Sequence, residues 1–399
     1  MPQLNRSDRV RGSLLGLAVG DALGAPLEGL SSQQIRAHYG VVDDYVDGTR
    51  AWKKKPYRWR MPGLYTDDTQ QALALCDVLL ECGEIVPERL ATIYLALANP
   101  KGTYLGAHRG VGRSFRQVLT ELERGVSPWE TGQSSAGIGA AMRIAPIALF
   151  FNDDLDALFD GVMAASLMTH RDVRSLSGAL VVCHTVRRLL DGERREPSLL
   201  FRIADDVARD ERLLTTRHAG SIDVGSYRGS LAVSVAKVER LLDMPRERAL
   251  LALVEEANRH GAMPVCKRPT MGFPPVCVPA CLYVLMTTDN FEDALTEVIN
   301  LGGDADSAGA ILGAMAGACH GLVDIPERWL NKLENREGIE LRAIALDRKS
   351  SDGLDLPDLV EREHELSGHE ANYRDALRSS LLNGGDHGAN SFVDSEPPM

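Results

Sequence analysis

Residues 12–24, GSLLGLAVGDALG, and residues 309–321, GAILGAMAGACHG, both carry glycine at every fourth position. A glycine inside a helix costs roughly 1 kcal/mol relative to alanine, so eight of them need a compensating contact. A spacing of four places the glycines on one helical face, where another backbone can approach closely. The two stretches therefore predict two helices packed tightly at the centre of the fold. The alternative is two unrelated core helices that tolerate glycine.

The rest of the chain repeats the helical pattern from end to end, and no alternating apolar run is long enough to predict a sheet. We expect a compact all-α domain over 6–335, a charged and partly helical extension over 336–382, and a disordered tail over 383–399. The expected helices cover 9–24, 69–82, 87–98, 110–124, 137–150, 155–168, 172–191, 198–210, 229–242, 246–260, 276–286, 291–300, 305–321 and 357–382.

Composition limits the compartment and the partners. The formal net charge of -12 argues against nucleic acid as a ligand. The seven cysteines form no CxxC pair and are odd in number, which favours a reducing compartment over a disulfide framework. The N-terminus lacks a signal-peptide layout, and no apolar run reaches the roughly 18 residues that span a bilayer. We expect a cytoplasmic protein with no membrane contact.

Two acidic motifs stand at predicted helix starts. Thr66-Asp67-Asp68 precedes one helix, and Asp304-Ala305-Asp306-Ser307 opens the second glycine-striped helix. Either motif alone would be read as a helix cap, because carboxylates and hydroxyls stabilise the first turn. Two such pairs, each with a hydroxyl, also suit hard divalent cations that prefer oxygen ligands. Four carboxylates close together would repel one another without metal, so a binuclear site is the economical interpretation.

Five segments in this order resemble the ADP-ribosylglycohydrolase family, which includes the dinitrogenase-reductase-activating glycohydrolases. The resemblance covers about residues 8–335 and rests on GSLLGLAVGDALGAPLEG (12–29), YTDDTQQAL (65–73), GIGAAMRIAPI (137–147), MTHRD (168–172) and NLGGDADSAGAILGAMAGACHG (300–321). The acidic motifs in this order, with the glycine-rich first helix, make the signature specific.

The resemblance implies an all-α fold with two Mg²⁺ or Mn²⁺ ions in a central cleft. It also implies cleavage of the bond between ADP-ribose and a modified protein side chain, arginine first among them. Glu28, Asp67 and Asp306 are the implied catalytic residues. The implied metal ligands are Thr66, Asp67, Asp68, Asp304, Asp306 and Ser307, the last of which is usually threonine in the family.

The resemblance further implies a substrate loop with Ser135, Gly137 and Gly139, whose backbone N–H groups at a helix start can receive phosphate. Family members often have asparagine between the two glycines, whereas this chain has Ile138, which cannot donate a side-chain hydrogen bond. His170 matches a histidine that contacts the nucleotide, with an ordinary core histidine as the alternative.

Three further features remain open at this stage. Asp21 matches a family position and is expected to support the helix rather than to bind metal. The basic aromatic stretch 52–60 is either a packed, solvated loop or a rim that receives the modified protein. The segment 103–113, with Tyr104, His108 and Arg109, is expected to border the cleft.

Two alternative functions also stay open. One is hydrolysis of another ADP-ribose conjugate, such as O-acetyl-ADP-ribose. The other is a non-catalytic, immunity-type protein that blocks an ADP-ribosylating enzyme or toxin. The expected partner is therefore an ADP-ribosylated protein or conjugate, with such an enzyme or toxin as the further candidate.

Overall fold

The computed structural model describes residues 4–98, 106–224, 229–262 and 265–383, and about two thirds of these residues are helical. Within these ranges no β-strand forms, and only three isolated β-bridges occur. The all-α prediction is confirmed.

The α-helices are α1 (Arg6–Gly24), α2 (Ser32–Tyr39), α3 (Asp67–Cys82), α4 (Pro87–Ala98), α5 (Arg113–Glu123), α6 (Gly139–Met142), α7 (Ala145–Phe150), α8 (Leu155–Leu167), α9 (Val173–Leu190), α10 (Pro197–Arg217), α11 (Leu231–Val238), α12 (Arg246–Arg259), α13 (Pro274–Thr287), α14 (Phe291–Asn300), α15 (Ala305–His320), α16 (Glu327–Leu330), α17 (Arg336–Arg348) and α18 (Leu359–Asn383). Four 3₁₀ turns join them, η1 (Ala25–Leu27), η2 (Pro56–Arg58), η3 (Glu239–Leu241) and η4 (Leu322–Asp324).

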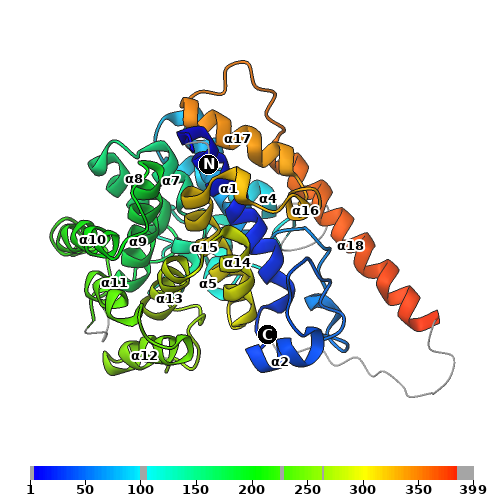
Figure 1. Ribbon diagram of the computed structural model, residues 1–399. Helices are drawn as coiled ribbons and strands as arrows, with labels where there is room; N and C mark the ends of the chain where they lie inside the picture. Colours follow the sequence, from blue (N-terminus) through cyan, green and yellow to red (C-terminus); the bar gives the residue numbers. More distant parts are fainter. Residues whose placement is uncertain (1–3, 99–105, 225–228, 263–264, 384–399) are drawn as a thin grey trace.

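The two glycine-striped helices, α1 and α15, pack against each other through the middle of the molecule (Figure 1). A Cβ built on Gly16 would lie 2.3 Å from the carbonyl oxygen of Gly313, and one on Gly20 would lie 2.0 Å from that of Gly309. Only glycine permits such an approach, because these neighbours are backbone atoms that cannot rotate away. The predicted central helix pair is confirmed, and the alternative of two unrelated helices is wrong. Gly321 does not belong to the stripe, since it ends α15 at φ 74°.

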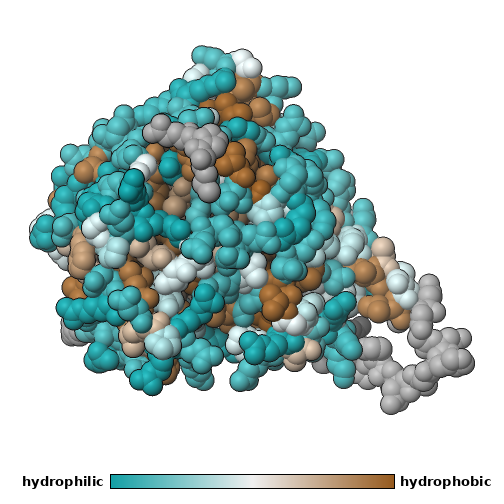
Figure 2. Space-filling view, viewed as in Figure 1, coloured by the Kyte–Doolittle hydropathy of each residue, from teal (hydrophilic) through white to brown (hydrophobic). Residues whose placement is uncertain are grey.

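The remaining helices surround this pair. α9, α13 and α14 pack on α15, whereas α17 packs on α1 and α3. Helices α10, α11 and α12 lie on one flank of the molecule, and α18 runs out along the other (Figure 1). The visible surface is mostly hydrophilic, with hydrophobic residues in small groups (Figure 2). None of the described helices is both long enough and apolar enough to cross a membrane.

Several helix boundaries differ from the predictions. The expected helix 137–150 is divided into α6 and α7 at Arg143–Ile144, just before Pro146, whose ring cannot continue an α-helix. Helix α10 continues seven residues beyond the expected end at 210. Helix α2 was not predicted, although Ser31 and Gln34 form a capping box whose Ser-x-x-Gln pattern is visible in the sequence.

The C-terminal segment packs on the domain through two helices. Helix α17 occupies 336–348, and α18 contacts α3 and α4 while burying Leu359, Glu363, Leu366 and Glu370. The expected division at 335/336 remains a proposal. Residues 384–399 of the expected tail lie outside the described residues. All seven cysteines are free, and five of them are buried.

Candidate metal and active site

The antiparallel pairing of α1 and α15 brings the two acidic motifs to one place. It sets the C-terminal end of α1 beside the start of α15, where a Cβ on Gly24 would lie 2.2 Å from the carbonyl oxygen of Ala305. Residues of α1 therefore reach both Asp304-Ala305-Asp306 and the start of α3. The glycine stripe is thus the packing feature that assembles the cleft.

Asp21, near the end of α1, fastens the start of α3. The backbone N–H groups and hydroxyls of Thr66 and Thr69 all donate to its carboxylate, at 2.7 to 3.0 Å. Burial raises the pKa of Asp21, and these hydrogen bonds act in the opposite direction. The Asp21 carboxylate therefore supports the start of α3, as expected.

The two motifs do not act as helix caps. Thr66 occupies the N-cap position of α3 and Asp304 that of α15, yet neither side chain accepts a capping hydrogen bond. The Thr66 hydroxyl donates to Asp21 instead and lies 3.3 Å from Asp68 Oδ2. The capping interpretation is wrong for both residues, because neither side chain accepts a hydrogen bond from the first turn of its helix.

The acidic side chains share a small cleft of about 290 Å³. Every predicted site residue except Thr66 lines it: Glu28, Asp67, Asp68, Ser135, Gly137, Gly139, His170, Asp304, Asp306 and Ser307. Thr66 is fully buried directly behind Asp68. Residues separated by nearly 280 positions in the sequence are thereby brought to one place.

The carboxylates destabilise one another's charged forms. Burial raises the pKa of Asp67 to about 8, with the charges of Asp21 and Glu28 adding to the effect. Burial likewise raises the pKa of Asp304 to about 6, against hydrogen bonds from Asp306 and Ser307 that lower it. Burial, followed by neighbouring carboxylates, holds the pKa values of Asp68 and Asp306 well above the ordinary range. A cluster of this kind needs positive charge or protons to be stable.

The donor set fits hard divalent cations. Asp68 Oδ1 is buried without a hydrogen-bond partner, although a buried carboxylate oxygen normally has one. The surrounding atoms are carboxylate and hydroxyl oxygens, the ligands that Mg²⁺ and Mn²⁺ prefer. In the described part of the chain no three His, Cys, Asp or Glu side chains already converge at metal-binding distance. Small rotations of these carboxylates would therefore accompany binding.

Two residues of the cleft, Gln71 and Gly272, were not predicted. Gln71 donates to Asp67 Oδ2 at 2.7 Å and accepts from Arg143, which is buried and has hydrogen bonds with Ala165 O and Thr169 as well. Gln71 stands one helical turn after Asp67, so its spacing could have indicated the contact. The sequence around Gly272 gives no comparable indication, yet a Cβ built on Gly272 would lie 2.2 Å from Asp304 Oδ2.

The predicted substrate loop lies beside the acids. Ser135 Oγ accepts from the Gly137 N–H at 3.3 Å, and a Cβ on Gly139 would lie 2.7 Å from the His170 ring. Burial, with Arg143 nearby, lowers the pKa of His170 to about 3, so its imidazole is neutral at physiological pH. Its Nδ1 is 2.8 Å from the Thr169 hydroxyl. Ile138 is buried in the same wall and offers only its backbone for polar contact.

Glu28 stands at the mouth of the cleft. Arg58 of the basic aromatic stretch donates to Glu28 Oε2 at 2.7 Å, and Trp52 donates to Pro26 O at 3.0 Å. Arg109 presents its carbonyl to the Asp67 N–H at 2.8 Å, and His108 lies beside it. These two residues border a neighbouring groove rather than the acidic cleft, and Thr103 and Tyr104 lie outside the described residues.

An all-helical fold with two acidic helix starts and a glycine loop around one cleft fits the class of helical hydrolases. A family model described as ADP-ribosylglycohydrolase matches residues 2–357, so the chain belongs to the ADP-ribosylglycohydrolase family. The fold and family predicted from the sequence are thus confirmed, and the chain is an enzyme, a hydrolase acting on glycosyl compounds.

Named relatives and a solved structure agree with this membership. ADP-ribosylarginine hydrolase Tri1 of Serratia proteamaculans is 27% identical over 345 residues, or 85% of this chain and 79% of the relative. ADP-ribosyl-[dinitrogen reductase] glycohydrolase of Rhodospirillum rubrum is 26% identical, over 84% of this chain and 93% of the relative. A solved structure described as an ADP-ribosylglycohydrolase-related protein complex is 29% identical with a TM-score of 0.61, covering 87% of this chain and 99% of that one.

Proposed function

We propose that this enzyme removes ADP-ribose from a modified protein, with arginine as the acceptor side chain, in a reaction that depends on two Mg²⁺ or Mn²⁺ ions. The observation that carries the proposal is the cluster of Asp67, Asp68, Asp304 and Asp306, whose charges repel one another and which includes a buried, unpaired carboxylate oxygen. Thr66 and Ser307 complete the set of six ligands. When bound, the cations would supply positive charge that orients the ribose hydroxyls and a water molecule.

The chain's own residues account for the rest of the reaction. Water adds at the anomeric carbon, the bond to the acceptor nitrogen breaks, and that nitrogen receives a proton. Glu28, at the mouth of the cleft, is placed to exchange the proton, while Asp67 and Asp306 hold the reacting groups in position. The backbone N–H groups near Gly137 and Gly139 receive the diphosphate, and neutral His170 contacts the nucleotide.

A second candidate substrate is another ADP-ribose conjugate, such as O-acetyl-ADP-ribose. It carries the same diphosphate as the protein substrate, so Ile138, which gives this loop no side-chain donor, affects both alike and leaves the acceptor side to distinguish them. The non-catalytic alternative is set aside, because the family is one of hydrolases.

The test compares three substrates, ADP-ribosyl-arginine, ADP-ribosyl-serine and O-acetyl-ADP-ribose, each with EDTA, Mg²⁺ or Mn²⁺. We expect release of ADP-ribose from the arginine conjugate only with metal, and a loss of about 100-fold or more in Asp67→Asn and Asp306→Asn. Asp375→Asn, on the exposed side of α18, is the matched control. Cleavage of none of the three substrates, with metal bound normally, would refute the proposal.

A further inference from the structure

A second and larger cavity opens beside the acidic cleft. It holds about 1210 Å³ and shares Glu28, Gly110 and Gly112 with the acidic cleft, so the two spaces meet at these residues. The glycine loop and His170 border only the smaller cleft. If ADP-ribose occupies the smaller cleft, the bond to be broken lies at the junction and the acceptor side points into the larger groove.

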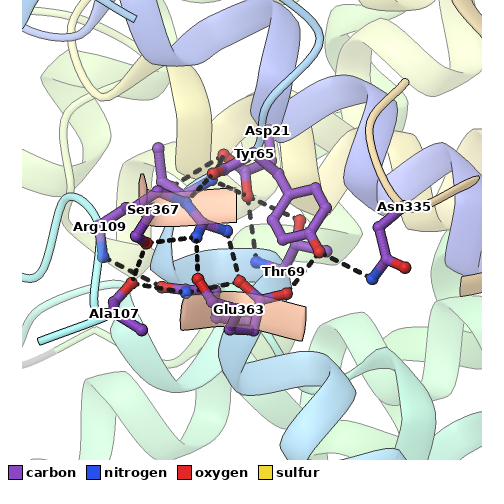
Figure 3. A network of polar contacts seen from close by, with 10 residues as sticks. Asp21, Tyr65, Thr69, Ala107, Arg109, Asn335, Glu363 and Ser367 are labelled. Carbon is purple, nitrogen blue, oxygen red and sulfur yellow. Dashed lines mark hydrogen bonds and ion pairs between the residues drawn. The ribbon is translucent and has the colours of Figure 1, made fainter. Parts of the chain in front are cut away.

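One wall of this groove is α18, which lies beyond the last residue matched by the family model. The helix is fixed there by Glu363, which is fully buried (Figure 3). Its carboxylate accepts from the Tyr65 hydroxyl at 2.5 Å, from Gln70 at 2.7 Å and from Arg109 at 2.5 Å.

These partners tie the groove to the acidic motif. Tyr65 immediately precedes Thr66, and Gln70 lies in the first turns of α3. A buried ion pair with all its hydrogen bonds made holds its elements in one arrangement. The groove wall and the metal-binding motif therefore form one rigid unit.

The lining of the groove fits polypeptide. The groove carries both signs of charge, so that neither a purely anionic nor a purely cationic ligand matches it: Arg58, Arg60, Arg109, Arg116 and Arg374 on one hand, and Glu28, Glu361, Glu365 and Glu370 on the other. Its volume exceeds what a single acceptor side chain needs, whereas a few residues of extended chain would fill it. Gly110 and Gly112 leave the backbone of the loop exposed along the wall opposite α18, where it can contact an extended segment.

We infer that the groove between α18 and the loop 106–112 binds the polypeptide segment that carries the ADP-ribosylated side chain. The inference rests on the proposed function and deepens it by assigning a second recognition surface. It makes the enzyme's selectivity depend on the protein around the modified residue as well as on the ADP-ribose.

Gly368 provides the test, because it is exposed on the groove face of α18 and a Cβ there meets nothing within 4 Å. Gly368→Trp should fill the groove without disturbing the fold. We expect the ratio of kcat/KM on an arginine-ADP-ribosylated protein to kcat/KM on free ADP-ribosyl-arginine to fall by about tenfold or more. His369→Trp, one residue along α18 and outside the groove, should leave the ratio at the wild-type value.

A charge-reversal variant, Glu361→Lys/Glu365→Lys, repeats the test without added bulk and should shift the same ratio. A ratio that stays constant in both groove variants overturns the inference, as does an equal shift in His369→Trp. If the wild-type enzyme cleaves neither substrate, the proposed function fails first and the assignment of the groove fails with it. Cleavage of the small conjugate with an unaltered ratio refutes the groove alone.

Discussion

At the scale of single residues, Asp21 shows how a carboxylate can serve a site without touching the reacting groups. It replaces the missing cap of α3 from another helix and satisfies four donors at once. Because Asp68 is two residues from Thr66, any loosening of this contact moves the acidic motif. The order of the cleft therefore depends on a residue outside it.

Replacement of Asp21 by asparagine should lower the free energy of unfolding by about 1–3 kcal/mol. The amide leaves one acceptor oxygen and places an N–H₂ group against N–H and O–H donors, so buried donors lose their partners. Urea unfolding followed by circular dichroism measures the change. The exposed control Asp375→Asn should stay within about 0.5 kcal/mol, and an Asp21→Asn midpoint equal to that of the control would contradict the role assigned to Asp21.

His108 predicts a pH dependence. Burial lowers its pKa to about 4, against an ordinary value of 6.5. Between pH 6.5 and about pH 4 this histidine is protonated in the unfolded chain but neutral in the folded protein. The stabilisation of the folded state is therefore complete above pH 6.5 and is lost as the pH falls toward 4. Between pH 7.5 and 5 the loss from this group is about 2 kcal/mol.

Unfolding curves of the wild type and His108→Phe at these two pH values check the prediction. Phenylalanine keeps the edge contacts with Tyr94 and Phe115. The advantage of the wild type over the variant should shrink as pH falls. An advantage that is the same at both pH values would show that His108 does not titrate differently on unfolding.

At the scale of elements, the pairing of α1 and α15 is the contact on which the cleft depends. A Cβ on Gly313 would lie 2.0 Å from the carbonyl oxygen of Gly16 and 2.6 Å from its carbon. Gly313→Ala must push the two backbones apart, and we expect it to cost about 3 kcal/mol or more in unfolding free energy. Thermal unfolding of the purified variant measures this cost.

Gly368→Ala is the matched control for Gly313→Ala. It makes the same chemical change inside α18, where a Cβ has open space. It should be neutral or stabilising by about 0.5–1 kcal/mol, because alanine restricts the unfolded chain more than glycine does. Equal effects of the two substitutions would mean that close backbone approach does not govern the helix pair.

The same elements show what the sequence could and could not predict. The four-residue glycine period and the acids at two helix starts are local patterns, and they were enough to predict the central pair and the meeting of the two acidic motifs. Glu28, the glycine loop and His170 were implied only by the family resemblance. The partners of Asp21 on α3, the close wall at Gly272 and the anchoring of α18 by Glu363 are contacts between distant segments, although the supporting role of Asp21 itself was implied by the resemblance. No local pattern encodes them, because the partner of a buried polar group is set by tertiary packing.

At the scale of the whole molecule, the proposed metal site joins segments from both ends of the chain. The first acidic motif lies in the first fifth of the sequence and the second in the last quarter, and α1 holds them together. Unfolding would separate the ligands, so the folded chain alone presents them together. A ligand that binds only the folded state stabilises it in proportion to the logarithm of its concentration.

We therefore expect Mn²⁺ to raise the unfolding temperature of EDTA-treated protein. A Mn²⁺ concentration of 100 times the dissociation constant should add about 2.7 kcal/mol to the unfolding free energy.

The double variant Asp68→Asn/Asp306→Asn should respond much less to Mn²⁺, because it removes two carboxylates from the cluster, whereas Asp375→Asn should respond like the wild type. The metal-free double variant should be at least as stable as metal-free wild type, since it also removes repulsion between buried charges. Differential scanning calorimetry with and without Mn²⁺ measures both effects. An increase of the same size in the double variant would place the bound metal elsewhere on the protein.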